Sequence, residues 1–223
     1  MRNFVKNAKY GIPVYLAAIN MRTGLAIIAP ILTVIGKDLG LSTIELAWLA
    51  AIPVLCFSFL APITLFLYRL GSIDRVISVA MWVLAISLLF RATGSVYTLF
   101  SFTLLMGIAV AVLNVTLPAW VKLHGGQHSG VITGTYAMLM GIVSAFALWL
   151  AAPLSSMTEY VWQFAMLPWG LLALICAIWW QVRLRDKQLR DFDQNSRSSW
   201  IKLLRNFRAW QVTLFFGLQA MNA

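Results

Sequence analysis

The fold of this chain follows from residues 11–35, which read GIPVYLAAINMRTGLAIIAPILTVI and contain a single charged side chain, Arg22. An α-helix needs about 20 predominantly apolar residues, at about 1.5 Å each, to cross the hydrocarbon core of a bilayer. The stretch meets this length, so it predicts a membrane-spanning helix. Arg22 lies about 16–20 Å from either end of that helix, which places it near the middle of the membrane.

Composition extends this conclusion to the whole chain of 223 residues. Hydrophobic residues make up 61% of the sequence and charged residues only 11%, and the mean hydropathy is +0.83. Charged residues make up about 25% of an ordinary soluble domain, and a soluble core of this size cannot bury so much apolar surface. The sequence therefore predicts an integral, all-α membrane protein in contact with the lipid bilayer.

The apolar runs predict six spans. After residues 11–35 they cover Leu46–Tyr68, Ile73–Ser95, Val96–Val121, Val131–Ala152 and Tyr160–Val182. A seventh apolar run occupies residues 209–223 and corresponds to only about 22 Å of helix. We therefore expect a six-helix bundle in residues 1–182, a basic cytoplasmic linker in residues 183–208 and the truncated start of a seventh helix in residues 209–223.

The distribution of basic residues predicts the orientation. Of the seventeen Lys and Arg residues, fourteen lie in the N-terminal tail, in the loops after the second and fourth spans, and in residues 183–208. The loops on the opposite side hold only Lys37 and Arg91. Lys and Arg are enriched in cytoplasmic loops, so we expect a cytoplasmic N-terminus in the inner (plasma) membrane. The same topology accounts for the net charge of +10, so nucleic acid is not an expected partner.

Arg22 is the first candidate for a functional role. A charged side chain at the centre of a membrane helix costs at least about 2.5–3.5 kcal/mol on insertion scales. The seven acidic residues lie at or beyond the predicted helix ends, so no carboxylate within these spans neutralises the guanidinium. Because a guanidinium binds anionic groups bidentately, we expect Arg22 to bind a small anionic or strongly polar solute. The alternative is a structural role, or a partner outside these residues.

The fourth and fifth predicted spans carry two further polar candidates. Asn114 lies about 12 Å inside the cytoplasmic end of its span, and Pro118, which lacks an N–H, frees the backbone carbonyl of Asn114. Tyr136 brings a hydroxyl group and an aromatic ring to a similar depth. We expect Asn114 and Tyr136 to orient the solute. The alternative for Asn114 is an interhelical hydrogen bond that only stabilises the bundle.

Prolines and glycines indicate how the helices move and pack. We expect Pro53 and Pro118 to help their helices flex during gating, and a simple static kink explains Pro53 equally well. Gly130 directly precedes the fifth span, and Gly134 and Gly141 lie within it. Small residues allow close helix packing in membranes. We therefore expect these three glycines to lie at helix–helix contacts.

Motifs for catalysis or metal binding are missing from the sequence. It contains no GxSxG, Walker or HExxH motif, and Cys56 and Cys176 lie singly in apolar runs. His124 and His128 are separated by two glycines and a glutamine, an arrangement typical of a loop and unfavourable for a metal site. We expect no catalytic residue, no metal and no cofactor, and we do not expect an enzyme.

Several segments together resemble one family. They are AINMRTGLAIIAPIL, LAAIPVLCFSFLAPI, GIAVAVLNVTLPAWVK, VITGTYAM and AWQVTLFFG. In their order and spacing they resemble the cyanate and 2-nitroimidazole transporter group of the major facilitator superfamily, whose motifs are of the type N-[LM]-R, T-x-P-[VL]-L and G-N-V-x-L-P-x-x-[IV]-K. In this resemblance Arg22 matches the arginine of the first motif. Asn114 and Pro118 match the third, and Tyr136 matches an aromatic residue on the fifth helix.

The resemblance implies a twelve-helix fold made of two six-helix halves, of which this chain holds the N-terminal one. It also implies secondary transport of a small anionic or polar solute by alternating access. The chain departs from the superfamily motif G-x-x-x-D-R-x-G-R-R, where Thr64 and Tyr68 replace the usual Gly and Asp. The implied partner is the missing C-terminal half or a second copy, and any proton carrier would lie there. A non-transporting remnant or an interaction subunit is the alternative.

Overall fold

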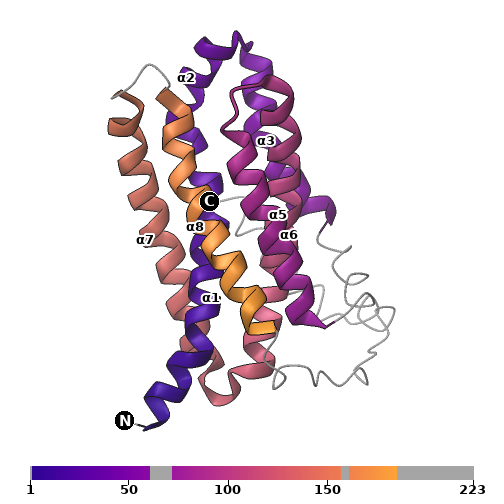
Figure 1. Cartoon of the computed structure of the whole chain (residues 1–223), viewed down its shortest axis with the longest axis vertical. Coiled ribbons are helices and arrows are strands. Elements are labelled where there is room, and N and C mark those ends of the chain that lie inside the picture. The colour runs from indigo at the N-terminus through magenta and orange to yellow at the C-terminus, as the bar shows by residue number, and fades with distance from the viewer. Residues whose placement is uncertain (1, 61–71, 157–160, 185–223) are drawn as a thin grey trace, which may run out of the picture. The chain divides into compact units, whose positions relative to one another are not determined.

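The structure is a computed structural model that describes residues 2–60, 72–156 and 161–184. Its regular elements in this part of the chain are all helical (Figure 1), which confirms the predicted all-α fold. The helices are α1 (Arg2–Ala26), α2 (Ile28–Leu39), α3 (Thr43–Leu60), α5 (Ile73–Arg91), α6 (Val96–His124), a short 3-10 helix η2 (Gly126–His128), α7 (Ser129–Ser156) and α8 (Val161–Leu184).

The membrane spans agree with the predicted ones in most places. Helices α5, α6, α7 and α8 are each long and apolar enough to cross a membrane, and α1 with α2 forms a bent fifth span. Helix α3 is shorter within the described residues, and the remainder of the predicted second span, residues 61–68, lies outside them. The predicted linker and seventh helix also lie outside the described residues from residue 185 onward. The described chain is thus a multi-pass membrane protein.

The first span differs from the single helix predicted for residues 11–35. Helix α1 ends at Ala26, α2 begins at Ile28, and the two are bent by 43°. Pro30 supplies the physical reason, because its missing N–H cannot donate to the carbonyl four residues earlier, at Ala26. The proline itself is tolerated in the first turn of α2, where an N–H has no intrahelical partner. The bend therefore divides the span only four residues after Arg22.

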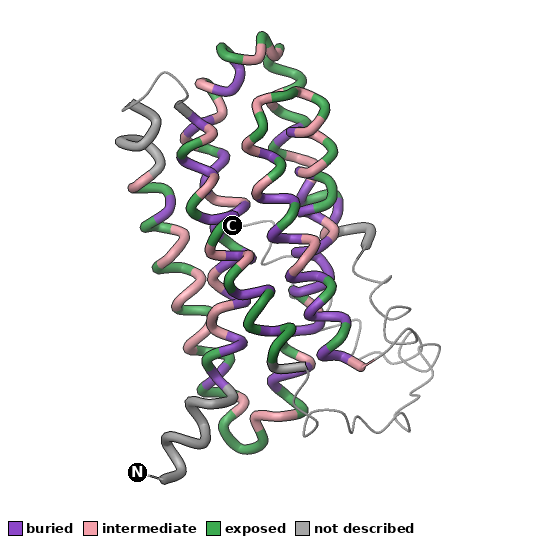
Figure 2. Tube along the Cα trace, viewed as in Figure 1, coloured by how far each residue is buried: buried purple, intermediate pink, exposed green. Residues whose placement is uncertain are grey.

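Two apolar cores hold the bundle together. Helix α5 packs against α6 and α8, α1 packs against α7 and α8, and α3 packs against α6. The larger core includes residues of α1, α5, α6 and α8, such as Ala17, Ile77, Met81, Leu84, Leu113 and Ala177, and the smaller core includes Ile31, Ile35, Leu99 and Trp162. Figure 2 shows the contrast between α5, which is largely buried, and α7, which is mostly exposed.

Several glycines lie at close helix contacts among the described residues, and three of them involve α1, α6 and α8. A Cβ added to Gly24 would lie 2.8 Å from Leu88, and one added to Gly170 would lie 2.7 Å from Leu89. At Gly107 the added Cβ would lie 2.8 Å from Cys56 and 3.1 Å from the Cα of Pro53. Lipid tails are as apolar as side chains, so close packing of small residues is an important attraction between membrane helices. These glycines therefore let α1, α6 and α8 approach their neighbours.

The glycines predicted at helix contacts are different ones. Gly130, Gly134 and Gly141 lie on α7, and a Cβ added to any of them would meet nothing within 4 Å. Only 11% of the α7 span is buried, against 56% of the α5 span. The predicted packing role of these three glycines therefore has no contact to support it among the described residues, and it stays a prediction for partners outside them.

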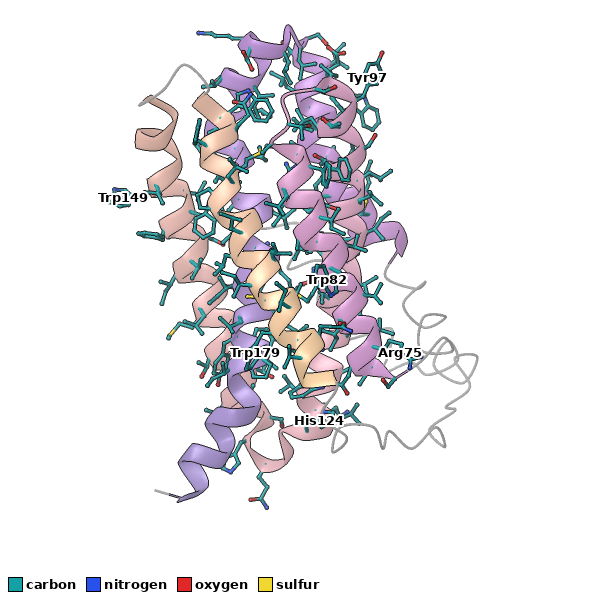
Figure 3. The ribbon with its side chains drawn as sticks, viewed as in Figure 1. Arg75, Trp82, Tyr97, His124, Trp149 and Trp179 are labelled. Carbon is teal, nitrogen blue, oxygen red and sulfur yellow. The ribbon has the colours of Figure 1, made fainter. Side chains whose placement is uncertain are left out.

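Hydrogen bonds from tryptophan indoles connect the helices at both ends of the bundle. The indole Nε1 of Trp120 donates to Oδ1 of the buried Asp74 at 2.7 Å, and that of Trp180 donates to the Asp74 carbonyl at 3.1 Å. At the other end, Trp162 Nε1 donates to Oδ2 of Asp38 at 2.7 Å. Figure 3 shows these two ends, with His124 near the one that holds the start of α1 and Tyr97 near the opposite one.

Candidate functional site

Two of the predicted solute-binding residues line one pocket. Arg22 from α1 and Asn114 from α6 share a pocket of about 380 Å³ with three residues of α7, namely Ala137, Met140 and Gly141. This volume lies within the range of about 300–1,000 Å³ that is usual for small-molecule sites. The lining of the pocket therefore consists of two strongly polar side chains on one side and an apolar wall on the other.

The helix geometry of α1 explains why Arg22 faces this pocket. Its neighbours Met21 and Thr23 are buried, at 3% and 0% exposure, whereas Arg22 is exposed. Successive residues of an α-helix point about 100° apart. Met21 and Thr23 therefore point into the core, whereas the guanidinium of Arg22 lies outside it. Among the described residues the guanidinium has no hydrogen bond or ion pair.

Asn114 is presented by α6 in a similar way. The helix continues without interruption from Val96 to His124, and its residues Leu113 and Thr116 are buried while Asn114 is exposed. The Asn114 side chain makes no hydrogen bond within the described residues, so the interhelical contact considered as the alternative is not observed there. Pro118, also exposed, lacks the N–H that would reach the Asn114 carbonyl, which leaves an amide and a carbonyl near the pocket.

Tyr136 lies beside the pocket rather than among the residues that line it. The ring is half-buried and packs against the larger core. Its chain neighbour Ala137 and Met140, one turn further along α7, form the wall instead. The lining residues at positions 137, 140 and 141 follow the three- and four-residue spacing of one helix face. Apart from this spacing, nothing in the sequence distinguishes Ala137 and Met140 from residues that face lipid.

The predicted gating prolines occupy different environments. Pro53 is buried, and its backbone lies at the tight contact between α3 and Gly107 of α6. Pro118 is exposed on α6, one turn beyond Asn114. A single structure does not show whether α3 and α6 bend at these prolines, so their roles in helix flexing stay predictions.

Within the described part of the chain, the charge of the pocket comes from Arg22, which has no acidic partner there. The residues that line it include no acidic side chain. Of the three described acids, Asp38 and Asp74 accept hydrogen bonds from tryptophans at the two ends of the bundle, and Glu45 accepts from Ser42. A guanidinium offers five N–H donors in a planar fork and no acceptor. Together with the amide of Asn114, it gives the pocket the chemistry to hold a small anion or a strongly polar molecule.

The family of the chain follows from comparison with known proteins. The model of the Major Facilitator Superfamily matches residues 14–223. The chain belongs to this superfamily. The match covers every described helix of the bundle from Val14 of α1 onward, and it confirms the predicted resemblance.

Relatives of this superfamily member carry transporter names. The chain is 33% identical to the uncharacterized transporter YycB of Bacillus subtilis over 206 residues, which cover 91% of this chain and 50% of the relative. It is 26% identical to the 2-nitroimidazole transporter of Escherichia coli, covering 93% and 53%, and 25% identical to the cyanate transport protein CynX of the same bacterium, covering 91% and 52%. The chain thus spans about half the length of these curated relatives. No solved structure shows a significant match.

The architecture of the superfamily is relevant to the position of the pocket. Major facilitators are built from two six-helix halves, with the substrate site between the halves near the middle of the membrane. In this chain the pocket opens between α1, α6 and the largely exposed α7. The pocket of this major facilitator chain thus lies against α7, the least buried of the four described single-helix spans.

Proposed function

We propose that this protein is a secondary transporter that moves a small anionic or polar solute, such as cyanate or a nitroimidazole-like compound, across the bacterial inner membrane by alternating access. The observation that carries the proposal is the guanidinium of Arg22, which faces a pocket without a partner among the described residues. A cation kept uncompensated at this depth is costly. A negatively charged or strongly polar solute that enters and leaves would offset that cost.

Each polar residue of the site has a distinct role in this proposal. Arg22 binds the solute through its bidentate fork, since paired charge-assisted hydrogen bonds are both strong and directional. Asn114 lines the same pocket and orients the solute with its amide. Tyr136, which lies next to the lining residue Ala137, helps Asn114 to orient the solute.

The apolar wall restricts the size and shape of the solute. Ala137, Met140 and Gly141 offer no hydrogen-bonding side chain, so a large, strongly hydrated solute would lose its water without replacement. A compact or planar solute loses fewer hydrogen bonds on entry. The relatives named for 2-nitroimidazole and for cyanate fit a site of this kind, and these two compounds are the first to be tested.

The proposal requires a second wall for the pocket. The relatives are about twice as long as this chain, and α7 is mostly exposed. A C-terminal half, or a second copy of the chain, would cover that face and close the site. Pro53 and Pro118 would let α3 and α6 bend as the two walls rock, with the N-terminus in the cytoplasm.

Solute uptake by the protein expressed from its own gene tests the proposal. Reconstituted vesicles would be supplied with radiolabelled cyanate or 2-nitroimidazole. Arg22→Lys keeps the charge but loses the fork, and we expect it to abolish uptake at unchanged protein content in the membrane. The matched control is Arg75→Lys, the same substitution at an exposed arginine outside the pocket. Undiminished uptake by Arg22→Lys would contradict the role of Arg22, and the absence of uptake of either compound by the unmodified protein would contradict the proposed solutes.

A further inference from the structure

A second arginine is buried on the other side of α1. Arg91 is the last residue of α5 and is only 1% exposed. The sequence places it near a helix end, and the predicted topology counts it with the loops, but the structure buries it completely. Arginine is almost never fully buried unless it is paired, so its contacts require an explanation.

Arg91 contacts the backbone of α1. Its Nη1 donates to the carbonyl oxygen of Gly24 at 3.1 Å and to the sulfur of Met106 at 2.9 Å. Its Nε and Nη2 are buried and have no acceptor among the described residues. A buried donor without a partner destabilises a fold, so the one strong bond of this guanidinium, to Gly24, is the contact that determines its position.

Gly24 lies at the end of α1 that precedes the bend. The last four carbonyls of a helix lack intrahelical donors, and α1 ends at Ala26. The carbonyl of Thr23 accepts a hydrogen bond from the backbone N–H of Ile27 at 3.1 Å, and that of Gly24 accepts from Arg91. A cation at this position also interacts favourably with the negative end of the helix dipole. Arg91 therefore caps α1 from a neighbouring helix.

The absence of a side chain at Gly24 makes this contact possible. A Cβ at this residue would lie 2.8 Å from Leu88 and 3.2 Å from the sulfur of Met106. The backbone of α1 therefore passes directly over α5, within reach of the Arg91 guanidinium.

The contact is coupled to the pocket through the rotation of α1. Arg22 and Gly24 are two residues apart, so their directions differ by about 200° around the helix axis. Arg91 thus holds α1 on the face opposite to the pocket. A rotation of α1 that broke the contact at Gly24 would turn the guanidinium of Arg22 away from Asn114.

We propose that Arg91 is a positioning residue for the Arg22 site. Its bond to the Gly24 carbonyl fixes both the rotation of α1 and the bend between α1 and α2, so that Arg22 faces the pocket. The effect on solute affinity rests on the proposed function, whereas the effect on the bend does not.

Two measurements on the protein expressed from its own gene test this proposal separately. Spin labels at Ile12→Cys on α1 and Thr33→Cys on α2, both exposed positions, report the bend as a distance distribution in a background with Cys56 and Cys176 replaced by alanine. Binding of cyanate and 2-nitroimidazole reports the site. We expect Arg91→Met, which removes every donor, to broaden the distance distribution and to weaken solute binding about tenfold. Arg91→Lys retains a charged donor, so we expect its distance distribution to be narrower and its solute binding stronger than those of Arg91→Met.

Coupling to Arg22 distinguishes positioning from a general loss of structure. In an Arg22→Met background, Arg91→Met should cause no further loss of binding, because effects on one shared interaction are not additive. Lys37→Met is the matched control, since it removes an exposed positive charge from α2 without touching the bend. We expect it to change neither measurement.

The outcomes separate the two proposals. An unchanged distance distribution in Arg91→Met overturns the positioning role whether or not any solute binds. A broadened distribution with unchanged binding, in a protein that binds a test solute, also overturns it. If the unmodified protein binds neither solute, the proposed solutes are wrong, while the labels still decide whether Arg91 holds the bend. If Arg91→Met does not accumulate in the membrane, Gly24→Ala takes its place, because its added Cβ pushes α1 away from Leu88. If Gly24→Ala does not broaden the distance distribution, the positioning role of Arg91 is refuted.

Discussion

Trp120 of α6 donates a hydrogen bond of 2.7 Å from its indole Nε1 to Oδ1 of Asp74, a carboxylate that is only 2% exposed in the first turn of α5. The indole of Trp180 on α8 donates to the backbone carbonyl of the same aspartate at 3.1 Å. The two tryptophan rings lie edge to face, with centroids 5.8 Å apart. Asp74 thus ties three helices together at one end of the bundle.

Replacing Trp120 by phenylalanine tests this connection. The ring stays but its N–H donor is lost, so one oxygen of the buried Asp74 carboxylate loses a hydrogen bond. Removing one partner of a buried polar pair costs about 1–3 kcal/mol. We expect Trp120→Phe to lower the midpoint of thermal unfolding of the detergent-solubilised protein. Trp149→Phe is the control because Trp149 is 69% exposed on α7 and points away from the bundle in Figure 3. Equal stability of the two variants would contradict the role of the Trp120–Asp74 bond.

Substitutions of Asn114 test the charge balance of the pocket. Asn114→Asp places a carboxylate in the lining that contains Arg22, and it would neutralise the guanidinium and repel an anion. Asn114→Leu removes only the polar contact, which for a bond to a charged group contributes about 1.5–3 kcal/mol. We therefore expect solute affinity to fall about 10–100-fold in Asn114→Leu, and further in Asn114→Asp. The measurement is isothermal titration of the purified protein with cyanate. Stronger binding to Asn114→Asp would exclude an anionic solute.

A third prediction concerns the contact between α3 and α6. A Cβ at Gly107 would lie 3.1 Å from the Cα of Pro53, a backbone atom that cannot move aside alone. We expect Gly107→Ala to destabilise the protein by about 1–3 kcal/mol, the usual cost of overpacking. Gly130→Ala is the matched control, since its Cβ would meet nothing within 4 Å, and alanine favours the helix by up to about 1 kcal/mol. Thermal unfolding of both variants measures the difference, which should have opposite signs.

The glycines also show what sequence reasoning reaches and what it misses in this chain. Apolar runs of sufficient length predict the helices, because a membrane requires that length. Which glycine lies at a contact depends on how each helix is rotated about its axis. Gly107 and Gly130 both lie in long apolar helices, and only the structure shows that Gly107 is enclosed and Gly130 is open.

The pocket was predictable only in its polar part. Arg22 and Asn114 stand out because each is costly or unusual in an apolar run, and the structure places both in one pocket. Met140 does not stand out, because a residue lining a solute pocket and one facing lipid are both apolar. The burial of Arg91 was missed for a related reason, since position along the chain indicates the depth of a residue but not the direction of its side chain. The bend after α1 did have a signal in Pro30, which removes one backbone donor.

A pair of glycines on α7 gives the sharpest test of the pocket itself. A Cβ at Gly134 or Gly141 meets nothing within 4 Å, but only Gly141 lines the pocket with Arg22. Gly141→Leu would therefore extend into solute space from a Cβ that meets no described atom within 4 Å, and we expect it to weaken binding of cyanate or 2-nitroimidazole by about tenfold or more. Gly134→Leu places the same side chain at an open position outside the lining, so its binding should be unchanged.

Both leucine variants should also keep the thermal stability of the unmodified protein, because the Cβ at either position meets no described atom within 4 Å and both positions are exposed. This second measurement separates a filled pocket from a damaged fold. If Gly134→Leu weakened binding as much as Gly141→Leu, the face of α7 would be sensitive as a whole, and the pocket between α1, α6 and α7 would not be the binding site. If neither affected binding in a protein that binds the solute, the solute would lie elsewhere.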